Sequence, residues 1–236
     1  MKLKRILTTA LVTMALGMLA ACGSSHKSSQ GQVVKGPVNG ATVTFDGDAT
    51  KTSTTNENGY YKILQKGVEV TSTGGKYIDI ATDTIANAPD MKAEAGATVI
   101  TPITTVMADM TDAEKADFKQ ALKELGINNP LTFSPAKVTA ATKEATELNE
   151  ILGFALVNTT PAKAKELANA LAAAVLIEDE ADSEAAISTA ITTFETDNSV
   201  SIPDYDAILD GIIEDGGKMP IETGATGGTD GGTTED

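Results

Sequence analysis

The sequence is poor in the residues on which many enzymes rely. It contains one cysteine, Cys22, one histidine, His26, and no tryptophan among 236 residues. A single cysteine excludes a disulfide framework, and one histidine cannot complete a zinc site built from cysteine and histidine ligands. A serine nucleophile commonly needs a histidine base, and the chain has neither a G-x-S-x-G elbow nor a G-x-x-x-x-G-K-[ST] phosphate loop. We therefore predict that the protein is not an enzyme and holds no cofactor and no metal.

Aromatic residues and positive charge are scarce as well. The chain has only four tyrosines and five phenylalanines, which is few for the aromatic platforms of a sugar-binding groove. It carries 18 basic and 33 acidic residues. Removal of residues 1–21, which the next paragraph treats as a signal peptide, takes three basic residues and no acidic one, and leaves a net charge of −18. So acidic a surface repels phosphate backbones, and we expect no binding to nucleic acid.

The N-terminus has the pattern of a secretory signal. Lys2, Lys4 and Arg5 precede an apolar run that ends at Cys22. The last four residues of this stretch, Leu-Ala-Ala-Cys, resemble the bacterial lipobox. This resemblance implies that residues 1–21 are removed and that Cys22 is acylated on its sulfur and on its new amine. Two or more acyl chains hold a protein durably to a bilayer. We expect membrane attachment through this lipid, at the outer membrane if the cell is Gram-negative, on its periplasmic or its exposed face.

Small polar residues at 22–30 predict a flexible tether, and His26 in it has no orienting neighbours. Residues 31–100 then show strand signals. Along residues 40–46 apolar and polar side chains alternate, which places Ala41, Val43 and Phe45 on one buried face. Asn58-Gly59 is typical of a tight hairpin turn. The pattern predicts a small antiparallel β-sandwich.

Two stretches in this region resemble a known module. The segments GQVVKGPVNGATVTFDG and TTNENGYYKI are similar to the first half of carboxypeptidase regulatory-like (transthyretin-like) sandwiches. The following TSTGGKYIDIATDT and AGATVITPITTVMADM are similar to a variant in bacterial surface proteins and lipoproteins, in which a T-P-L-T-T-L stretch leads into helices. The resemblance implies an extracytoplasmic, non-catalytic module. Many such modules carry a longer acidic insert that looks calcium-binding, whereas this chain has only Asp46-Gly47-Asp48 there.

Residues 101–215 predict a helical bundle. In TPITTVMADM the apolar residues recur at the spacing of one helix face, with Thr101 as the cap and Pro102 at the first helical position. The pairs Ser134-Pro135 and Thr160-Pro161 predict two further helix starts of the same kind, and Thr111 begins a capping box. Residues 216–236 are rich in glycine, threonine and acids and predict a disordered tail. The expected fold class is α+β, a β-sandwich followed by an all-α bundle.

Three groups of residues are candidates for chemistry. The acidic groups around 178–184 and at Asp204, Asp206 and Asp210 have ligands suited to calcium, but solvated helix junctions account for them equally well, with Asp182 or Ser183 as a cap. Lys35 invites comparison with sandwich modules that join a lysine to an asparagine by an isopeptide bond. That reaction needs a late-strand asparagine and a buried glutamate, which the sequence does not identify. We therefore expect Lys35 to be a solvated turn residue.

These observations favour a lipid-anchored envelope protein that acts as a binding, scaffold or assembly module. Its partner is expected to be another protein of the envelope or outside the cell. Two alternatives stay open: a carboxylate- or metal-dependent envelope hydrolase, and a purely structural spacer.

Overall fold

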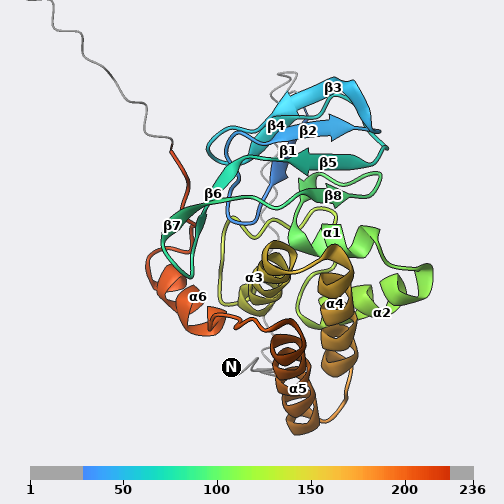
Figure 1. The fold of residues 1–236 in the computed structure, drawn as a ribbon, viewed down its shortest axis with the longest axis vertical. Helices are drawn as coiled ribbons and strands as arrows, with labels where there is room; N and C mark the ends of the chain where they lie inside the picture. Colours follow the sequence, from blue (N-terminus) through green and yellow to red (C-terminus); the bar gives the residue numbers. More distant parts are fainter. Residues whose placement is uncertain (1–28, 224–236) are drawn as a thin grey trace, which may run out of the picture.

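The computed structural model describes residues 29–223, in which nine strands precede six helices (Figure 1). This α+β arrangement is the predicted one. The strands are β1 (Gln30–Val33), β2 (Thr42–Phe45), β3 (Asp48–Thr54), β4 (Tyr60–Lys62), β5 (Val70–Thr73), β6 (Lys76–Asp79), β7 (Thr84–Asn87), β8 (Met91–Ala93) and β9 (Val99–Ile100). The helices are α1 (Pro102–Ala108), α2 (Asp112–Glu124), α3 (Lys143–Asn158), α4 (Pro161–Val175), α5 (Glu180–Asn198) and α6 (Tyr205–Glu214).

The strands form two small sheets and a separate hairpin. One sheet has the order β4-β1-β9, the other β3-β2-β5-β8, and β6 pairs with β7. All pairs are antiparallel as expected except β1 with β9, which run parallel. The two sheets share a core to which the buried faces of both contribute. Its buried members are Val33, Val38, Ala41, Val43, Phe45, Tyr61, Val70, Tyr77, Met91, Ala93 and Ile100.

Local sequence explains the first hairpin. The alternation predicted around β2 is confirmed, because Ala41, Val43 and Phe45 are fully buried. The tight turn between β2 and β3 lies at Asp46-Gly47, where both residues have positive φ angles, 55° and 66°. The hairpin predicted at Asn58-Gly59 is wrong, because the turn there carries the chain from β3 in one sheet to β4 in the other.

The helix start predicted at Thr101-Pro102 is confirmed. The Thr101 side chain accepts a hydrogen bond from the Thr104 backbone N–H, and Pro102 is the first residue of α1. Residues Ile103, Val106 and Met107 of this helix are buried. In Figure 1 the helix lies directly below the sheet edge formed by β8, and the hydroxyl of Thr105 accepts from the backbone N–H of Lys92 in that strand. Helix α1 therefore connects the sheets to the helices.

Of the three other predicted helix starts, two are confirmed and one is wrong. The capping box of Thr111 and Glu114 begins α2, and Thr160 caps α4 ahead of Pro161. The helix predicted to start at Ser134-Pro135 starts later, at Lys143, where α3 begins. Residues 136–138 instead pair with residues 217–219, through hydrogen bonds from Val138 N to Gly217 O and from Met219 N to Ala136 O. This long-range pairing overrides the local helix signal.

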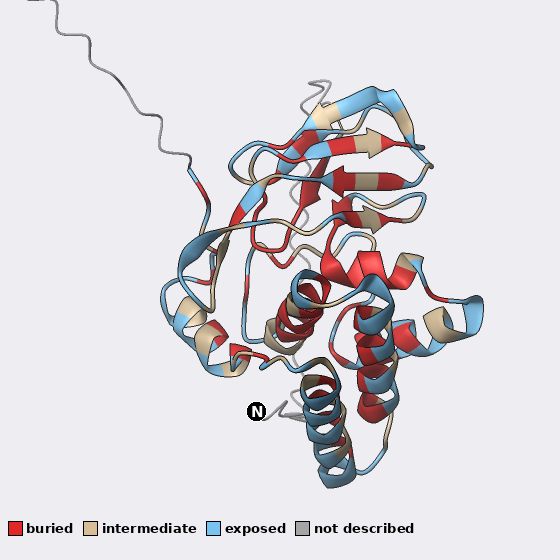
Figure 2. Cartoon of the chain, viewed as in Figure 1, coloured by how far each residue is buried: buried red, intermediate tan, exposed pale blue. Residues whose placement is uncertain are grey.

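Helix α3 is the centre of the helical region. Figure 2 shows it buried on most sides, between the sheets and the outer helices, whereas α5 is buried along one face only. Polar residues of α3 are enclosed together with its apolar ones. They are Thr146, Glu147, Asn149 and Glu150.

The C-terminal segment continues beyond α6. Residues 216–223, which composition assigns to the tail, contain the buried Gly217, Met219 and Glu222, and Met219 packs with Val138 and Leu209. The predicted signal peptide, Cys22, His26 and residues 224–236 lie outside the described residues. No helix among residues 29–223 has the length and apolarity needed to cross a membrane.

Candidate functional site

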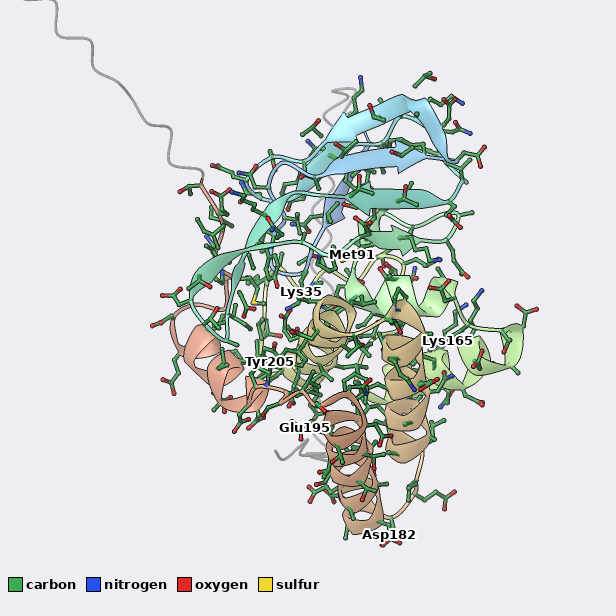
Figure 3. The ribbon with its side chains drawn as sticks, in the orientation of Figure 1. Lys35, Met91, Lys165, Asp182, Glu195 and Tyr205 are labelled. Carbon is green, nitrogen blue, oxygen red and sulfur yellow. The ribbon has the colours of Figure 1, made fainter. Side chains whose placement is uncertain are left out.

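Lys35 lies where the sheets meet the helices. It occupies the turn that follows β1, as predicted, but its side chain is only 1% exposed, so the prediction of a solvated lysine is wrong. Its Nζ donates to Oε2 of Glu150 on α3 at 2.5 Å, and this carboxylate is also 1% exposed. Figure 3 shows Lys35 between the sheets and α3, with Tyr205 of α6 on the same side. The side chain of Lys35 thus links three parts of the fold.

The pocket around the ammonium group is aromatic. Nζ lies 5.2 Å from the ring centre of Tyr77 and 5.8 Å from that of Tyr205, within range of a cation–π interaction. A side chain on Gly153 of α3 would overlap Cδ and Cε of Lys35, so a glycine there leaves room for the lysine. Burial is the largest single effect and would lower the pKa of Lys35, but Glu150, Tyr205 and Tyr77 together outweigh it, and the pKa is raised.

This arrangement stabilises a protonated lysine. A protonated amine is not a nucleophile, and solvent does not reach it. The buried glutamate that the sequence did not reveal is Glu150, but it comes from a helix, and it holds Lys35 as an ion pair. The nearby Asn149, whose Nδ2 donates to Glu150 Oε1 at 3.3 Å, also belongs to that helix rather than to a late strand.

Glu147 of α3 is a buried carboxyl without a hydrogen-bond partner. It is fully buried, and neither of its oxygens has a partner among residues 29–223. Burial raises its pKa to about 7, and the negative charge of Asp206 adds to the effect. Near neutral pH this side chain therefore changes between a neutral and a charged form inside the protein.

The two acidic groups that were candidates for calcium have structural roles. Asp179 caps α5 by accepting from the Asp182 backbone N–H at 3.0 Å, so the cap is neither of the two residues predicted. In the other group, Lys143 bridges Asp206 at 2.8 Å and Asp210 at 2.5 Å. Within residues 29–223 no cluster of three or more acids, histidines or cysteines has the geometry of a metal site.

Besides a shallow hollow of about 520 Å³ whose lining includes Asn39, Lys76 and Glu222, two hollows are open to solvent. One, of about 300 Å³, lies at the end of the sandwich and includes Phe45, Tyr61 and Val70 in its walls; here it is named the sandwich-end pocket. The other, of about 650 Å³, lies between the first strands and the C-terminal segment and is named the Lys137–Lys218 groove. Its lining residues are Gln32, Pro37, Asn58, Tyr60, Ser134, Ala136, Lys137, Lys218, Met219, Pro220 and Ile221.

Comparison with known proteins gives no relative. No family model, no curated protein and no solved structure matches the chain. The function of the site is therefore argued from its own chemistry.

Within the Lys137–Lys218 groove, Ser134 and Lys137 have an S-x-x-K spacing. On a helix this spacing would bring both side chains to one face, but here the segment is a turn. The Ser134 hydroxyl donates to Gln32 Oε1 at 2.6 Å, so its proton is directed to an amide oxygen rather than to a base. Lys137 makes no hydrogen bond to it. The pair does not have the geometry of an activated serine.

Proposed function

We propose that this chain is a lipid-anchored protein of the bacterial cell envelope that binds a partner without catalysis, and that the Lys137–Lys218 groove is its binding surface. The lipobox-like sequence ending at Cys22 supports the anchor. The resemblance of residues 31–126 to surface-protein sandwich modules supports an extracytoplasmic role.

The observation that carries the proposal is the position of the groove along the chain. Gln32 lines it and follows Cys22 by ten residues, a stretch that spans at most about 35 Å when fully extended. A lipid on Cys22 would thus hold the groove close to the bilayer. Confinement to this layer raises the effective concentration of neighbouring envelope components, so that weak contacts become productive.

The distribution of ionisable groups favours binding over turnover. An acid–base catalyst needs a group with a shifted pKa within reach of a substrate. Glu147, the carboxyl whose pKa is raised to about 7, and Lys35 are both buried. The residues that line the Lys137–Lys218 groove include no acid. A carboxylate-dependent hydrolase would need the opposite arrangement.

Anchoring and binding are tested together in cells. Cys22→Ala should abolish incorporation of a labelled fatty acid, and label retained on that variant would exclude Cys22 as the lipid site. A photo-crosslinking residue in place of Tyr60, in the groove, should capture a specific envelope component in cells that carry the anchored protein. The same residue in place of Lys119, exposed on α2, serves as the control. Equal capture from both positions would contradict a binding role for the groove.

A further inference from the structure

We propose that the Lys137–Lys218 groove recognises a phosphate monoester carried on a flat or apolar body, an inference that rests on the proposed function because it assigns the ligand class of the same surface. The chemistry is common to a free phosphate ester and to a phosphomonoester lipid headgroup. Four features of the groove lead to this class.

The first feature is the placement of the two lysines. The hydrogen bonds from Val138 N to Gly217 O, 2.6 Å, and from Met219 N to Ala136 O, 3.1 Å, enclose the pair Lys137 and Lys218. In this antiparallel pattern the enclosed residues are directly opposite each other, and their Cβ atoms are about 4.5–5.5 Å apart. Two like charges in this position repel each other. A bound anion would remove that repulsion.

The second feature is the absence of a carboxylate partner. Neither Lys137 nor Lys218 forms an ion pair within residues 29–223, although acids outnumber bases in the chain by 33 to 18. The acid in the adjoining segment, Glu222, has its Oε2 held by Asn39 at 2.7 Å. Among residues 29–223, seven other lysines contact carboxylates: Lys35, Lys51, Lys92, Lys115, Lys143, Lys163 and Lys165. Five more form no ion pair in the described residues, namely Lys62, Lys66, Lys76, Lys119 and Lys123, but none of these lies directly opposite another lysine in a strand pairing. The groove is therefore an exposed site with two uncompensated positive charges in an acidic protein.

The third feature is the apolar wall beside the lysines. Tyr60 is 44% exposed and Ile221 is 36% exposed, and both line the groove together with Pro37 and Pro220. Exposed large apolar side chains that gather in a concave site are typical of ligand recognition. A flat or aliphatic body next to the anion would cover them.

The fourth feature is a fixed floor. Gln32 donates from Nε2 to the Asn58 backbone oxygen at 2.8 Å and accepts from Ser134 at 2.6 Å, so its orientation is set before any ligand binds. A volume of about 650 Å³ is within the range for small ligands. The charge decides the class: two ammonium groups match the nearly double negative charge of a phosphate monoester, whereas a carboxylate would neutralise only one.

The test is a binding titration on the mature chain without acyl groups, in which binding is measured by calorimetry and by NMR chemical-shift changes. Phenyl phosphate is the main probe, and benzoate, inorganic phosphate and benzyl alcohol are compared with it. We expect phenyl phosphate to bind saturably and most tightly, with shifts at Tyr60, Lys137 and Lys218. The double variant Lys137→Gln/Lys218→Gln should weaken it by about tenfold or more. The control Lys119→Gln/Lys123→Gln makes the same charge change on exposed positions of α2 and should leave binding unchanged.

Several outcomes would overturn the inference. They are equal losses in the two double variants, tighter binding of benzoate than of phenyl phosphate, or shifts confined to the sandwich-end pocket. Vesicles of phosphatidylcholine with and without phosphatidic acid distinguish a lipid headgroup from a free phosphate ester. Binding to the acidic vesicles that depends on the two lysines indicates a headgroup. Binding of the soluble probe without binding to these vesicles indicates a free ester. If crosslinking from Tyr60 succeeds while every phosphate probe fails, the proposed function stands and the ligand class falls.

Discussion

The buried carboxyl of Glu147 should make the stability of this protein decrease as the pH rises through the neutral range. Its pKa is about 7 in the folded protein against 4.5 as the ordinary value. Below pH 4.5 the group is protonated in both folded and unfolded states, and it has no effect on their balance. Between pH 4.5 and 7 the unfolded chain loses the proton while the folded chain keeps it, so the free energy of unfolding decreases. Above pH 7 both forms are ionised, and the difference stays constant.

The size of the effect follows from the shift. One pKa unit corresponds to about 1.4 kcal/mol, so the free energy of unfolding should fall by about 3 kcal/mol between pH 4.5 and 8. The charged groups around Glu147 are Asp206 and Asp204, with Glu144 on its own helix, and Lys143 offsets them only in part. Ionisation of Glu147 therefore places a negative charge beside the acids near the start of α6.

Glu147→Gln is the informative substitution because it keeps the shape and removes the titration. Denaturant unfolding can be monitored by circular dichroism at several pH values between 5 and 8. We expect the free energy of unfolding to decrease with increasing pH for the wild type and to stay nearly constant for the variant. At pH 8 the variant should be the more stable, although its amide also lacks partners, which reduces the gain below 3 kcal/mol.

Glu178→Gln changes an exposed carboxyl and is the matched control. It should follow the wild-type curve. A wild-type stability that is constant or increases from pH 5 to 8, or a Glu147→Gln variant with the same slope as the wild type, would refute the reasoning.

Two further predictions concern the Lys35 pocket. In denaturant unfolding, Lys35→Met should reduce the free energy of unfolding by about 3–5 kcal/mol, because Glu150 is left buried and unpaired. The double variant Lys35→Met/Glu150→Leu should recover most of this loss. A double variant no more stable than Lys35→Met would show that the two side chains are not in contact. In a helix, glycine to alanine normally adds up to about 1 kcal/mol of stability, and Gly211→Ala, at an open position of α6, should do so. Gly153→Ala should instead lower the melting temperature, because its new methyl group overlaps the side chain of Lys35. If Gly153→Ala raised the melting temperature as much as Gly211→Ala does, the lysine side chain would have to move aside freely.

The sequence predicted those elements whose signals are local. Thr101-Pro102 predicted α1 correctly because the cap and the proline act within one turn of helix. The same two-residue signal at Ser134-Pro135 failed because residues 136–138 form backbone hydrogen bonds with residues some 80 positions later. A propensity of a few tenths of a kcal/mol per residue is easily outweighed by such tertiary pairing.

The candidate sites could not be predicted from local sequence either, because they also depend on contacts between distant residues. Lys35 looks solvated because its turn is rich in glycine and proline, and its partner Glu150 is 115 residues away. A signal was nevertheless present in α3: apolar residues occur on all sides of the stretch after Glu150, as expected for a helix enclosed by others. A charged residue at the start of such a stretch needs a buried partner. The Lys137–Lys218 groove required knowledge of which segments pair, and no spacing in the sequence gives that.

The parallel pairing of β1 with β9 has a mechanical consequence. Strand β1 is where the N-terminal part of the chain enters the described body, and its backbone N–H groups alternate between two neighbours: those of Gln32 and Val34 donate to Thr98 and Ile100, and that of Val33 donates to Gly59. A pull along the chain from its N-terminal side would load the bonds on both sides of β1 at once, in shear. A strand at the edge of a sheet would instead separate from a single neighbour. If the proposed lipid on Cys22 tethers the body at this end, β1 is placed to resist the resulting tension.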